Sequence, residues 1–357
     1  MSVHRFLHQE ENILEELDMK KLFLAAITVL AFNAVFAQSS LKFRPDGSFK
    51  IVQFTDLHYN SCKKESTVVL KRIQEVLDAE RPDLVVITGD LIYSSPARKA
   101  LRQIFNCISS QGIPFCSVWG NHDADFGTDK GTMYDFIRSF PCCVMPDRSG
   151  VLSPDYTLPI LSSDGEKAAS VLYLMDSNAH IFQDGKFVGY DWIKESQVEW
   201  YKSTSRQFTA DNGGQALPSV AFFHIPLPEF HDAVRNEYCT MIGTRMEPAC
   251  APEHNSGMFA ACKEMGDVMA IFAGHDHDND YAVEFQDILL AYGRYTGGNT
   301  EYNNLPNGAR VIILKEGKRE LDSYVRIKGG QILNRFSFPG SFHQADWRSR
   351  PLDPECR

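Results

Sequence analysis

Side chains that can bind metal ions recur directly after apolar segments of this sequence. Five short polar stretches stand where an apolar run ends: Asp56-Leu57-His58, Gly89-Asp90, Gly120-Asn121-His122-Asp123, His224, and Gly274-His275-Asp276-His277. Carboxylate oxygen and imidazole nitrogen are ligands for ions such as zinc, manganese and iron. No two of the cysteines form a Cys-x-x-Cys pair, which argues against a zinc ribbon or a thioredoxin site. These residues therefore favour a metal centre with oxygen and nitrogen ligands.

The five stretches are informative mainly as a combination. An isolated Asp-x-His or Gly-Asp after a strand is commonly an ordinary turn. Gly120–Asp123 is a stronger signal, because glycine permits a tight turn while three consecutive polar residues after an apolar run have no packing role. Two histidines after the apolar run that ends at Ala273 are equally hard to explain as core residues. The order of all five argues against coincidence.

Apolar runs of strand length must bring these residues together. Runs that end at or near the polar stretches predict strands at 50–55, 84–88, 115–119, 170–175, 219–223 and 268–273. Helix-like stretches at 66–79, 97–110 and 191–206 supply the crossovers that parallel strands require. From residue 281 onward, short alternating runs predict antiparallel strands of a second sheet. Because ligands bind at the carboxyl ends of strands in open α/β sheets, we expect the polar stretches to converge.

Composition and charge narrow the classes of function. The chain has 357 residues, of which 43% are hydrophobic, and shows no low-complexity bias or internal repeat, which indicates a globular domain at 38–340 and a short tail at 341–357. Its 36 basic and 46 acidic residues leave a net charge of −10. This charge argues against nucleic acid or an anionic membrane surface as the main partner, because both bind basic patches. A small anionic substrate stays compatible if metal ions reverse the sign inside a cleft.

The N-terminal segment predicts export. Residues 19–37 begin with a methionine and two lysines, continue as an apolar run and end in Val35-Phe36-Ala37, the pattern of a secretory signal peptide cleaved after Ala37. The apolar run is shorter than the roughly 20 residues that span a bilayer, and Gln38 offers no site for a lipid anchor. Residues 1–18 are polar and acidic, so we expect translation to begin at Met19. We therefore expect a periplasmic or secreted protein without a stable membrane anchor.

Nine cysteines are present, and export makes one or two disulfides plausible. Cys239 and Cys250, in one long loop-like stretch, are the pair we consider first. Cys107 and Cys116 lie in apolar stretches and are equally compatible with plain core packing.

The order Asp-x-His, Gly-Asp, Gly-Asn-His-Asp, strand-borne His and Gly-His-x-His resembles the calcineurin-like metallophosphoesterases. The resemblance covers about residues 50–280. The stretch Gly274–Asp280, followed by Tyr292-Gly293-Arg294 and Thr296-Gly297-Gly298, is similar to the single-domain purple-acid-phosphatase-like branch. The resemblance implies a fold of two packed mixed β-sheets flanked by helices, and a binuclear metal site.

The resemblance also implies a role for each motif residue. One metal would be held by Asp56, His58, Asp90 and His277, and the other by Asp90, Asn121, His224 and His275, with Asp90 bridging. His122 would stand beside the leaving group as proton donor or charge stabiliser, and Asp123 would orient its imidazole. Asn121 could also contact the substrate. Arg294 could bind a phosphate with its guanidinium or form a surface ion pair, and both interpretations stay open.

One departure from the pattern concerns Tyr93. Purple acid phosphatases that bind ferric iron through tyrosine combine Asp-x-Gly with Gly-Asp-x-x-Tyr, whereas this chain has His58 in the first motif and Tyr93 in the second. Both residues would compete for one ligand position. We favour His58 as the ligand, which leaves Tyr93 in the pocket.

These observations predict an exported, metal-dependent phosphoric ester hydrolase that uses two ions of manganese, zinc or iron. Two metals about 3.5–4 Å apart can lower the pKa of water to about 7 and neutralise the phosphate, so the predicted nucleophile is a metal-bound hydroxide. The substrate would be a small phosphate monoester or diester. The alternative, from another class, is a metal-binding but inactive relative that acts as a binding protein. The intact ligand set and His122 argue against it.

The N-terminal interpretation predicts two masses. The precursor should begin at Met19 and the mature chain at Gln38, as determined by intact-mass spectrometry of the cellular and exported protein. Detection of residues 1–18 in the cellular precursor would contradict the predicted start.

Overall fold

The first sheet forms around runs of β-branched and aromatic residues. In the computed structural model, which describes residues 41–298 and 300–342, this sheet contains β1 Ser48–Phe54, β2 Leu84–Thr88, β3 Phe115–Val118, β13 Gly308–Lys315, β14 Leu321–Ile327 and β15 Ile332–Phe338. Their order is β15-β14-β13-β1-β2-β3. Strands β1, β2 and β3 are parallel, and β13 joins β1 antiparallel. Every residue of β2 is buried, as expected for a parallel strand covered on both faces.

The second sheet is also mixed. It contains β4 Tyr156–Leu161, β5 Ala168–Leu174, β8 Ser219–Phe222, β9 Met241–Ile242, β10 Val268–Ala273, β11 Ala282–Phe285 and β12 Ile288–Tyr292. The order is β4-β5-β8-β10-β12-β11-β9, with β5, β8, β10 and β12 parallel and the outer strands antiparallel. A separate hairpin pairs β6 His180–Gln183 with β7 Lys186–Tyr190.

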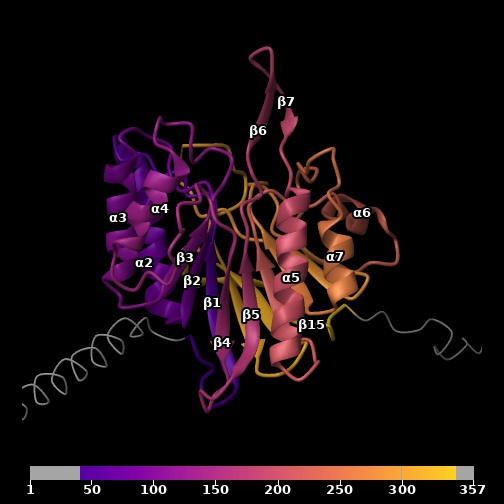
Figure 1. Ribbon diagram of the computed structural model, residues 1–357. Coiled ribbons are helices and arrows are strands. Elements are labelled where there is room, and N and C mark those ends of the chain that lie inside the picture. The colour runs from indigo at the N-terminus through magenta and orange to yellow at the C-terminus, as the bar shows by residue number, and fades with distance from the viewer. Residues whose placement is uncertain (1–40, 299, 343–357) are drawn as a thin grey trace, which may run out of the picture. The chain divides into compact units, whose positions relative to one another are not determined.

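Helices cover the outer faces of the two sheets. The helices are α2 Val68–Glu80, α3 Ala97–Ser109, α4 Lys130–Arg138, α5 Glu195–Asp211, α6 Glu229–Arg235 and α7 Met258–Met265, with 3₁₀ turns at Lys64–Thr67 and Lys328–Gly330. Figure 1 shows α2, α3 and α4 on the side of the first sheet and α5, α6 and α7 on the side of the second. The predicted fold of two packed mixed sheets flanked by helices is therefore confirmed.

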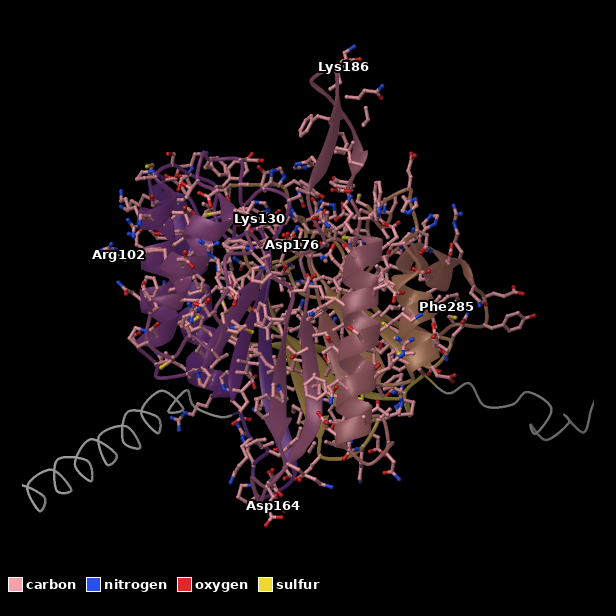
Figure 2. The ribbon with its side chains drawn as sticks, viewed as in Figure 1. Arg102, Lys130, Asp164, Asp176, Lys186 and Phe285 are labelled. Atoms are coloured by element: carbon pink, nitrogen blue, oxygen red, sulfur yellow. The ribbon has the colours of Figure 1, made fainter. Side chains whose placement is uncertain are left out.

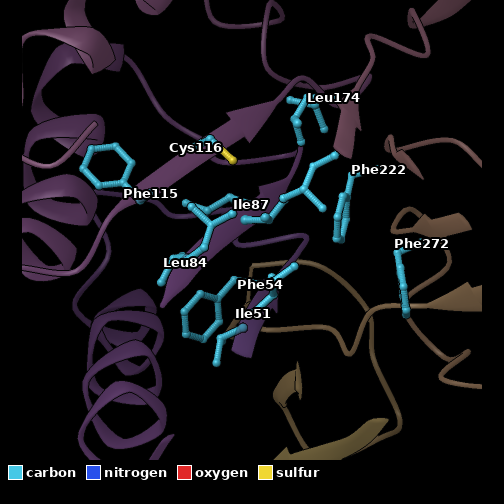
Figure 3. Close-up of a cluster of buried hydrophobic side chains, with 14 of the residues drawn as sticks. Ile51, Phe54, Leu84, Ile87, Phe115, Cys116, Leu174, Phe222 and Phe272 are labelled. Carbon is cyan, nitrogen blue, oxygen red and sulfur yellow. The ribbon is translucent and has the colours of Figure 1, made fainter. Parts of the chain in front are cut away.

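Successive side chains along the strands of the second sheet lie alternately in two different hydrophobic cores. Leu172 and Phe222 lie in the core between the sheets, whereas Tyr173 and Ala221 lie in the core beneath α5 and α7. Figure 3 shows the inner core, where Ile87 and Cys116 of the first sheet lie in one cluster with Leu174, Phe222 and Phe272 of the second. This period of two is the direct result of the strand pleat.

The positions of the predicted strands and crossover helices agree with the structure to within a few residues. The expectation that the runs after residue 281 are antiparallel strands of a second sheet is only partly correct, because β13 and β14 join β1 in the first sheet and β12 is parallel to β10. Sequence patterns gave β2 and β10 with their observed bounds. They missed β4, the β6–β7 hairpin, β9 and β15, together with α4, α6 and α7. The missed strands are short or lie at sheet edges, and the three missed helices all have fewer than ten residues. Short elements carry too few periods for a reliable signal.

The predicted N-terminal segments lie outside the residues that the structure describes, and the predicted disulfide is not formed. The extension at 1–18 and the signal peptide at 19–37 lie outside the described residues, and so does nearly all of the tail at 341–357. The prediction of a Cys239–Cys250 disulfide is wrong, because both thiols are free. Within 41–298 and 300–342, no helix combines the length and the apolar character needed to cross a membrane.

A buried polar network around the ion pair of Asp280 and Arg294 joins the second sheet to the first. The Asp280 carboxylate, which is fully buried, accepts hydrogen bonds from Arg294, from Nδ2 of Asn334 at 2.9 Å and from the backbone N–H of Thr244 at 2.7 Å. Arg310 donates to the Asp280 backbone carbonyl at 2.5 Å. The charge of Asp280 is thus fully compensated, as burial requires.

Replacing Asp280 should be costly, because it leaves the buried Arg294 without its ionic partner, whereas the hydrogen bond of Arg310 to the backbone carbonyl remains. Asp280→Ala should lower the free energy of unfolding by about 3–5 kcal/mol. Asp135→Ala is the control, since Asp135 is 51% exposed, pairs with Arg148 at the surface, and should cost less than about 1 kcal/mol. Urea unfolding of both variants measures the difference. Equal losses would contradict this account.

Candidate metal centre and active site

The predicted ligands converge at the carboxyl ends of strands from both sheets. Asp56 and His58 follow β1, Asp90 follows β2, and Asn121 follows β3. From the second sheet, the ligands are His224 after β8 and His275 and His277 after β10. All seven are buried, with exposed fractions between 0% and 8%. The convergence expected from the strand pattern is therefore present.

Backbone contacts tie the two sheets together at this end. The N–H of Thr296, after β12, donates to the carbonyl of Thr55, after β1, at 3.0 Å. The buried Gln53 side chain on β1 donates to the carbonyl of Ala273, the last residue of β10, at 3.0 Å. The loops that carry the ligands thus have a fixed separation.

One group of ligand atoms consists of Asp56, His58 and His277, which lie within 4.8 Å of one another. Oδ1 of Asp56 is 3.6 Å from Nε2 of His277 and 4.0 Å from Nε2 of His58. The two imidazole Nε2 atoms face each other at 3.2 Å. A cation beside both nitrogens would satisfy them together.

A second group contains Asp56, Asp90 and His224. Oδ2 of Asp90 is 3.3 Å from Nε2 of His224 and 3.5 Å from Nε2 of His58, so this carboxylate reaches both groups. Oδ1 of Asn121 is 2.9 Å from Nε2 of His224. The position of Asp90 is the one that a bridging ligand needs, although Asp56 is the residue common to both groups here.

Hydrogen bonds set the tautomers of two ligand histidines. Nδ1 of His224 donates to the carbonyl of Thr88 at 2.7 Å, and Nδ1 of His277 donates to the carbonyl of Tyr302 at 2.8 Å. A carbonyl can only accept, so a neutral ring in either place presents its Nε2 lone pair to the site. Nε2 of His275 is buried and has no hydrogen-bond partner, so its lone pair is available to coordinate a metal ion.

The shifted pKa values of the site residues indicate an excess of buried negative charge. Burial alone would lower the pKa of His224, but the carboxylates of Asp90 and Asp56 outweigh it and raise that pKa to about 10. Burial likewise opposes ionisation of Asp56, yet His224 and His277 lower the pKa of Asp56 to about 2. Burial lowers the pKa of His58 to about 4. Two ionised carboxylates thus draw a proton to His224 where a metal ion can supply the charge instead.

The donor set fits two metal ions. Buried carboxylates that reach several imidazoles, lone pairs directed inward and an unpartnered Nε2 are together the features of a metal centre rather than of a packed core. The chain therefore has a buried Asp/His site consistent with a binuclear centre. The identity of the metals is not fixed by ligands of this kind.

The ligand loops are conformationally strained. Asp56, His58, Asp90 and His275 have φ values of 53°, 40°, 51° and 79°. Left-handed backbone is unfavourable for residues with a side chain and concentrates at functional sites. The turns direct these side chains away from the strand axes and toward the common centre.

Two glycines make room for the carboxylates. A Cβ at Gly120 would lie 2.1 Å from Oδ1 of Asp90, and a Cβ at Gly274 would lie 2.0 Å from Oγ1 of Thr55 and 2.9 Å from Oδ2 of Asp56. The glycines of the Gly-Asn-His-Asp and Gly-His-x-His stretches are thus required by packing against the ligands.

The neighbours of His122 differ from the prediction. Nδ1 of His122 is 2.7 Å from the carboxylate of Asp125, whereas Asp123 accepts from the backbone N–H groups of Asp90, Leu91 and Gly120. The prediction that Asp123 orients the imidazole is therefore wrong, because both of its oxygens are used to hold the loop that carries Asp90. The imidazole of His122 is 33% exposed and stands at the edge of the cleft.

Arg294 takes neither of its two predicted positions. It is 1% exposed, pairs with Asp280 and donates from Nε to the carbonyl of Pro306 at 2.7 Å. It does not line the cleft, so its predicted contact with substrate is wrong. The strand-end position was correct, but the side chain is directed into the core.

Sequence analysis missed several residues of the cleft. A cleft with about 330 Å³ of empty space is lined by predicted ligands and His122, and in addition by Tyr190, Glu301 and Tyr302. Tyr93 lies beside the site, and its ring is 5.5 Å from the ring of His58. The hydrogen bond between the side chains of Tyr93 and Glu301 raises the pKa of Tyr93 to about 12. His58 lies in one ligand group with Asp56 and His277, and its role as the ligand in place of Tyr93 stays a prediction. Glu301 and Tyr302 follow no strand signal, so no pattern marked them.

Comparison with known families assigns the chain. The family model for calcineurin-like phosphoesterases matches residues 49–279, which include every predicted ligand. The chain belongs to the calcineurin-like phosphoesterase family. The match confirms the resemblance inferred from the motifs.

The similarity to individual relatives is moderate in sequence and extends over most of this chain. The chain is 32% identical over 311 residues to "Probable inactive purple acid phosphatase 14" of Arabidopsis thaliana, covering 77% of each chain. It is 30% identical over 332 residues to "Phosphatase DCR2" of Saccharomyces cerevisiae, covering 80% of this chain and 54% of that protein. A dimetal phosphatase from Danio rerio has a similar fold, with a TM-score of 0.56 and 13% identity, over 81% of this chain and 98% of the other.

Filling the space at Gly274 should disturb the centre without altering a ligand. Gly274→Ala should destabilise the fold by about 1–3 kcal/mol, because overpacked sites must shift, and should leave less than about half of the metal bound per folded chain. Gly340→Ala is the control, since its nearest neighbour is 3.9 Å away. Thermal unfolding and elemental analysis measure the two effects. Full metal content in Gly274→Ala would contradict the packing argument.

Proposed function

We propose that this metallophosphoesterase is an active, exported hydrolase of phosphate esters that uses two metal ions. The observation that carries the proposal is the position of Asp90, whose Oδ2 lies 3.5 Å from His58 and 3.3 Å from His224 while its Oδ1 accepts from the backbone of His122. One carboxylate thus connects both ligand groups to the residue at the edge of the cleft. Metals bound there would lower the pKa of water and neutralise charge on the phosphate.

Three other residues of the site would each have a separate role in the reaction. His122 would hold or donate a proton at Nε2 toward the leaving oxygen, because Asp125 engages its Nδ1. The hydroxyl of Tyr190 stays protonated, since burial raises the pKa of Tyr190 to about 12, and it could donate a hydrogen bond to a phosphate oxygen. Asn121 presents Oδ1 to His224 and Nδ2 to His180 at 3.0 Å, which fixes its amide at the site.

A second candidate function is that of a metal-binding protein without hydrolase activity. The printed name of the Arabidopsis relative, "Probable inactive purple acid phosphatase 14", favours it, whereas the name "Phosphatase DCR2" of the yeast relative favours catalysis. His122 and its Asp125 partner support the enzyme, because a protein that only binds metal has no need of an oriented imidazole beside the ligands. Whether the ester is a monoester or a diester depends on the walls of the cleft.

Turnover of a paired aryl phosphomonoester and aryl phosphodiester tests the proposal. The chain from Gln38, loaded with manganese, zinc or iron, should hydrolyse at least one ester. Asp90→Asn should lose most activity together with metal, whereas His122→Ala should keep its metal and lose about 10²-fold or more in kcat, the usual range for general acid catalysis. Asp135→Asn, at the surface, should behave as the parent chain.

The outcomes separate the candidate functions. Two bound ions without turnover of either ester would favour the binding protein. Loss of metal from His122→Ala would contradict the division of roles between ligands and proton donor.

A further inference from the structure

The β6–β7 hairpin exposes large apolar side chains beside the site. Asp184 and Gly185 at its turn have φ values of 51° and 74°, as a tight hairpin turn requires. Figure 1 shows the hairpin projecting from the rest of the protein, and Figure 2 places Lys186 near its far end. Phe182 and Phe187 are 62% and 51% exposed. Phe182 and Phe187 face each other across the two strands, and neither belongs to the two hydrophobic cores of the protein.

These rings are continuous with the metal site. The Phe182 ring is 6.3 Å from that of Phe187, which is 5.3 Å from Tyr190, whose ring lies 4.4 Å from His275. We name Phe182, Phe187, Tyr190 and His180 the aromatic ladder. It reaches from a predicted metal ligand to the exposed part of the hairpin.

The ladder also passes the position of the leaving group. The His180 ring lies 5.0 Å from His122 and 5.5 Å from Phe187. A leaving group that departs past His122 therefore meets His180 first and the phenyl rings next. A small polar alcohol would end before Phe187, whereas a larger apolar one would lie along both rings.

We propose that the aromatic ladder binds the apolar part of the phosphate ester, so that the preferred substrates are esters of large apolar or aromatic alcohols. This inference rests on the proposed hydrolase function and adds the substrate class to it. Aromatic rings bind such groups through apolar burial and edge-to-face contacts. Exposed apolar patches of this kind commonly mark binding surfaces.

The test compares two primary alkyl esters with matched leaving-group chemistry, ethyl phosphate and naphthylethyl phosphate. The double variant Phe182→Ala/Phe187→Ala removes two exposed rings and leaves every metal ligand and His122 in place. KM for naphthylethyl phosphate should rise about tenfold, with kcat changed by less than about twofold. Both constants for ethyl phosphate should stay unchanged. Ile332→Ala, which removes a 38% exposed apolar side chain from β15, is the control and should alter neither ester.

Equal KM values for naphthylethyl phosphate in the parent chain and the double variant would overturn the proposal. So would equal changes for both esters.

Equilibrium binding keeps this inference separable from the proposed function. If the parent chain hydrolyses neither ester, the hydrolase proposal fails, and the fluorescence of naphthylethyl phosphate still reports its affinity for the metal-loaded chain. A loss of about tenfold in affinity in the double variant would support the ladder, whereas equal affinity would overturn it. Sedimentation with phosphatidylcholine vesicles adds a further arm. Vesicle binding that needs both rings, with ester affinity unchanged, would identify a membrane contact and overturn the proposal.

Discussion

The structure depends on a concentration of buried negative charge. Asp56 and Asp90 are each 1% exposed and both reach the same imidazoles. Buried carboxylates are tolerated only where positive charge or hydrogen bonds compensate them. A proton drawn to His224 supplies part of that charge here, and two metal ions would supply it completely. The strained turns and the glycines at the strand ends follow from this requirement, because only they let the ligand atoms come so close together.

The two-sheet fold is what makes such a site possible. Each sheet alone contributes part of the ligand set, so neither could hold both ions. The contacts from Thr296 to Thr55 and from Gln53 to Ala273 join the sheets where the ligands lie. Asp280 and Arg310 join them again through a buried ion network. Stability and site geometry therefore share the same interface between the sheets.

The cleft is asymmetric in a way that bears on substrate choice. Its floor is charged and buried, while one wall continues into the aromatic residues of the β6–β7 hairpin. His122 and Asp125 stand between these two environments. A phosphate ester has the same division, with an anionic group at one end and an alcohol of variable character at the other. The protein thus offers a separate environment to each end of such a molecule.

The sequence by itself determined the ligand types, the strands that carry them and the family, because each ligand stretch directly follows a strand-forming run and this order is local information. It predicted seven candidate ligands, which the structure brings together, and its resemblance to the family implied the mixed two-sheet fold. Only the tertiary structure decided the partners of side chains from different segments. Asp125 rather than Asp123 contacts His122, since Asp123 is used by three backbone amides. Arg294 pairs with Asp280, and Tyr190, Glu301 and Tyr302 enter the cleft. The physical reason is that such contacts depend on how loops distant in sequence pack together, which strand periodicity does not encode.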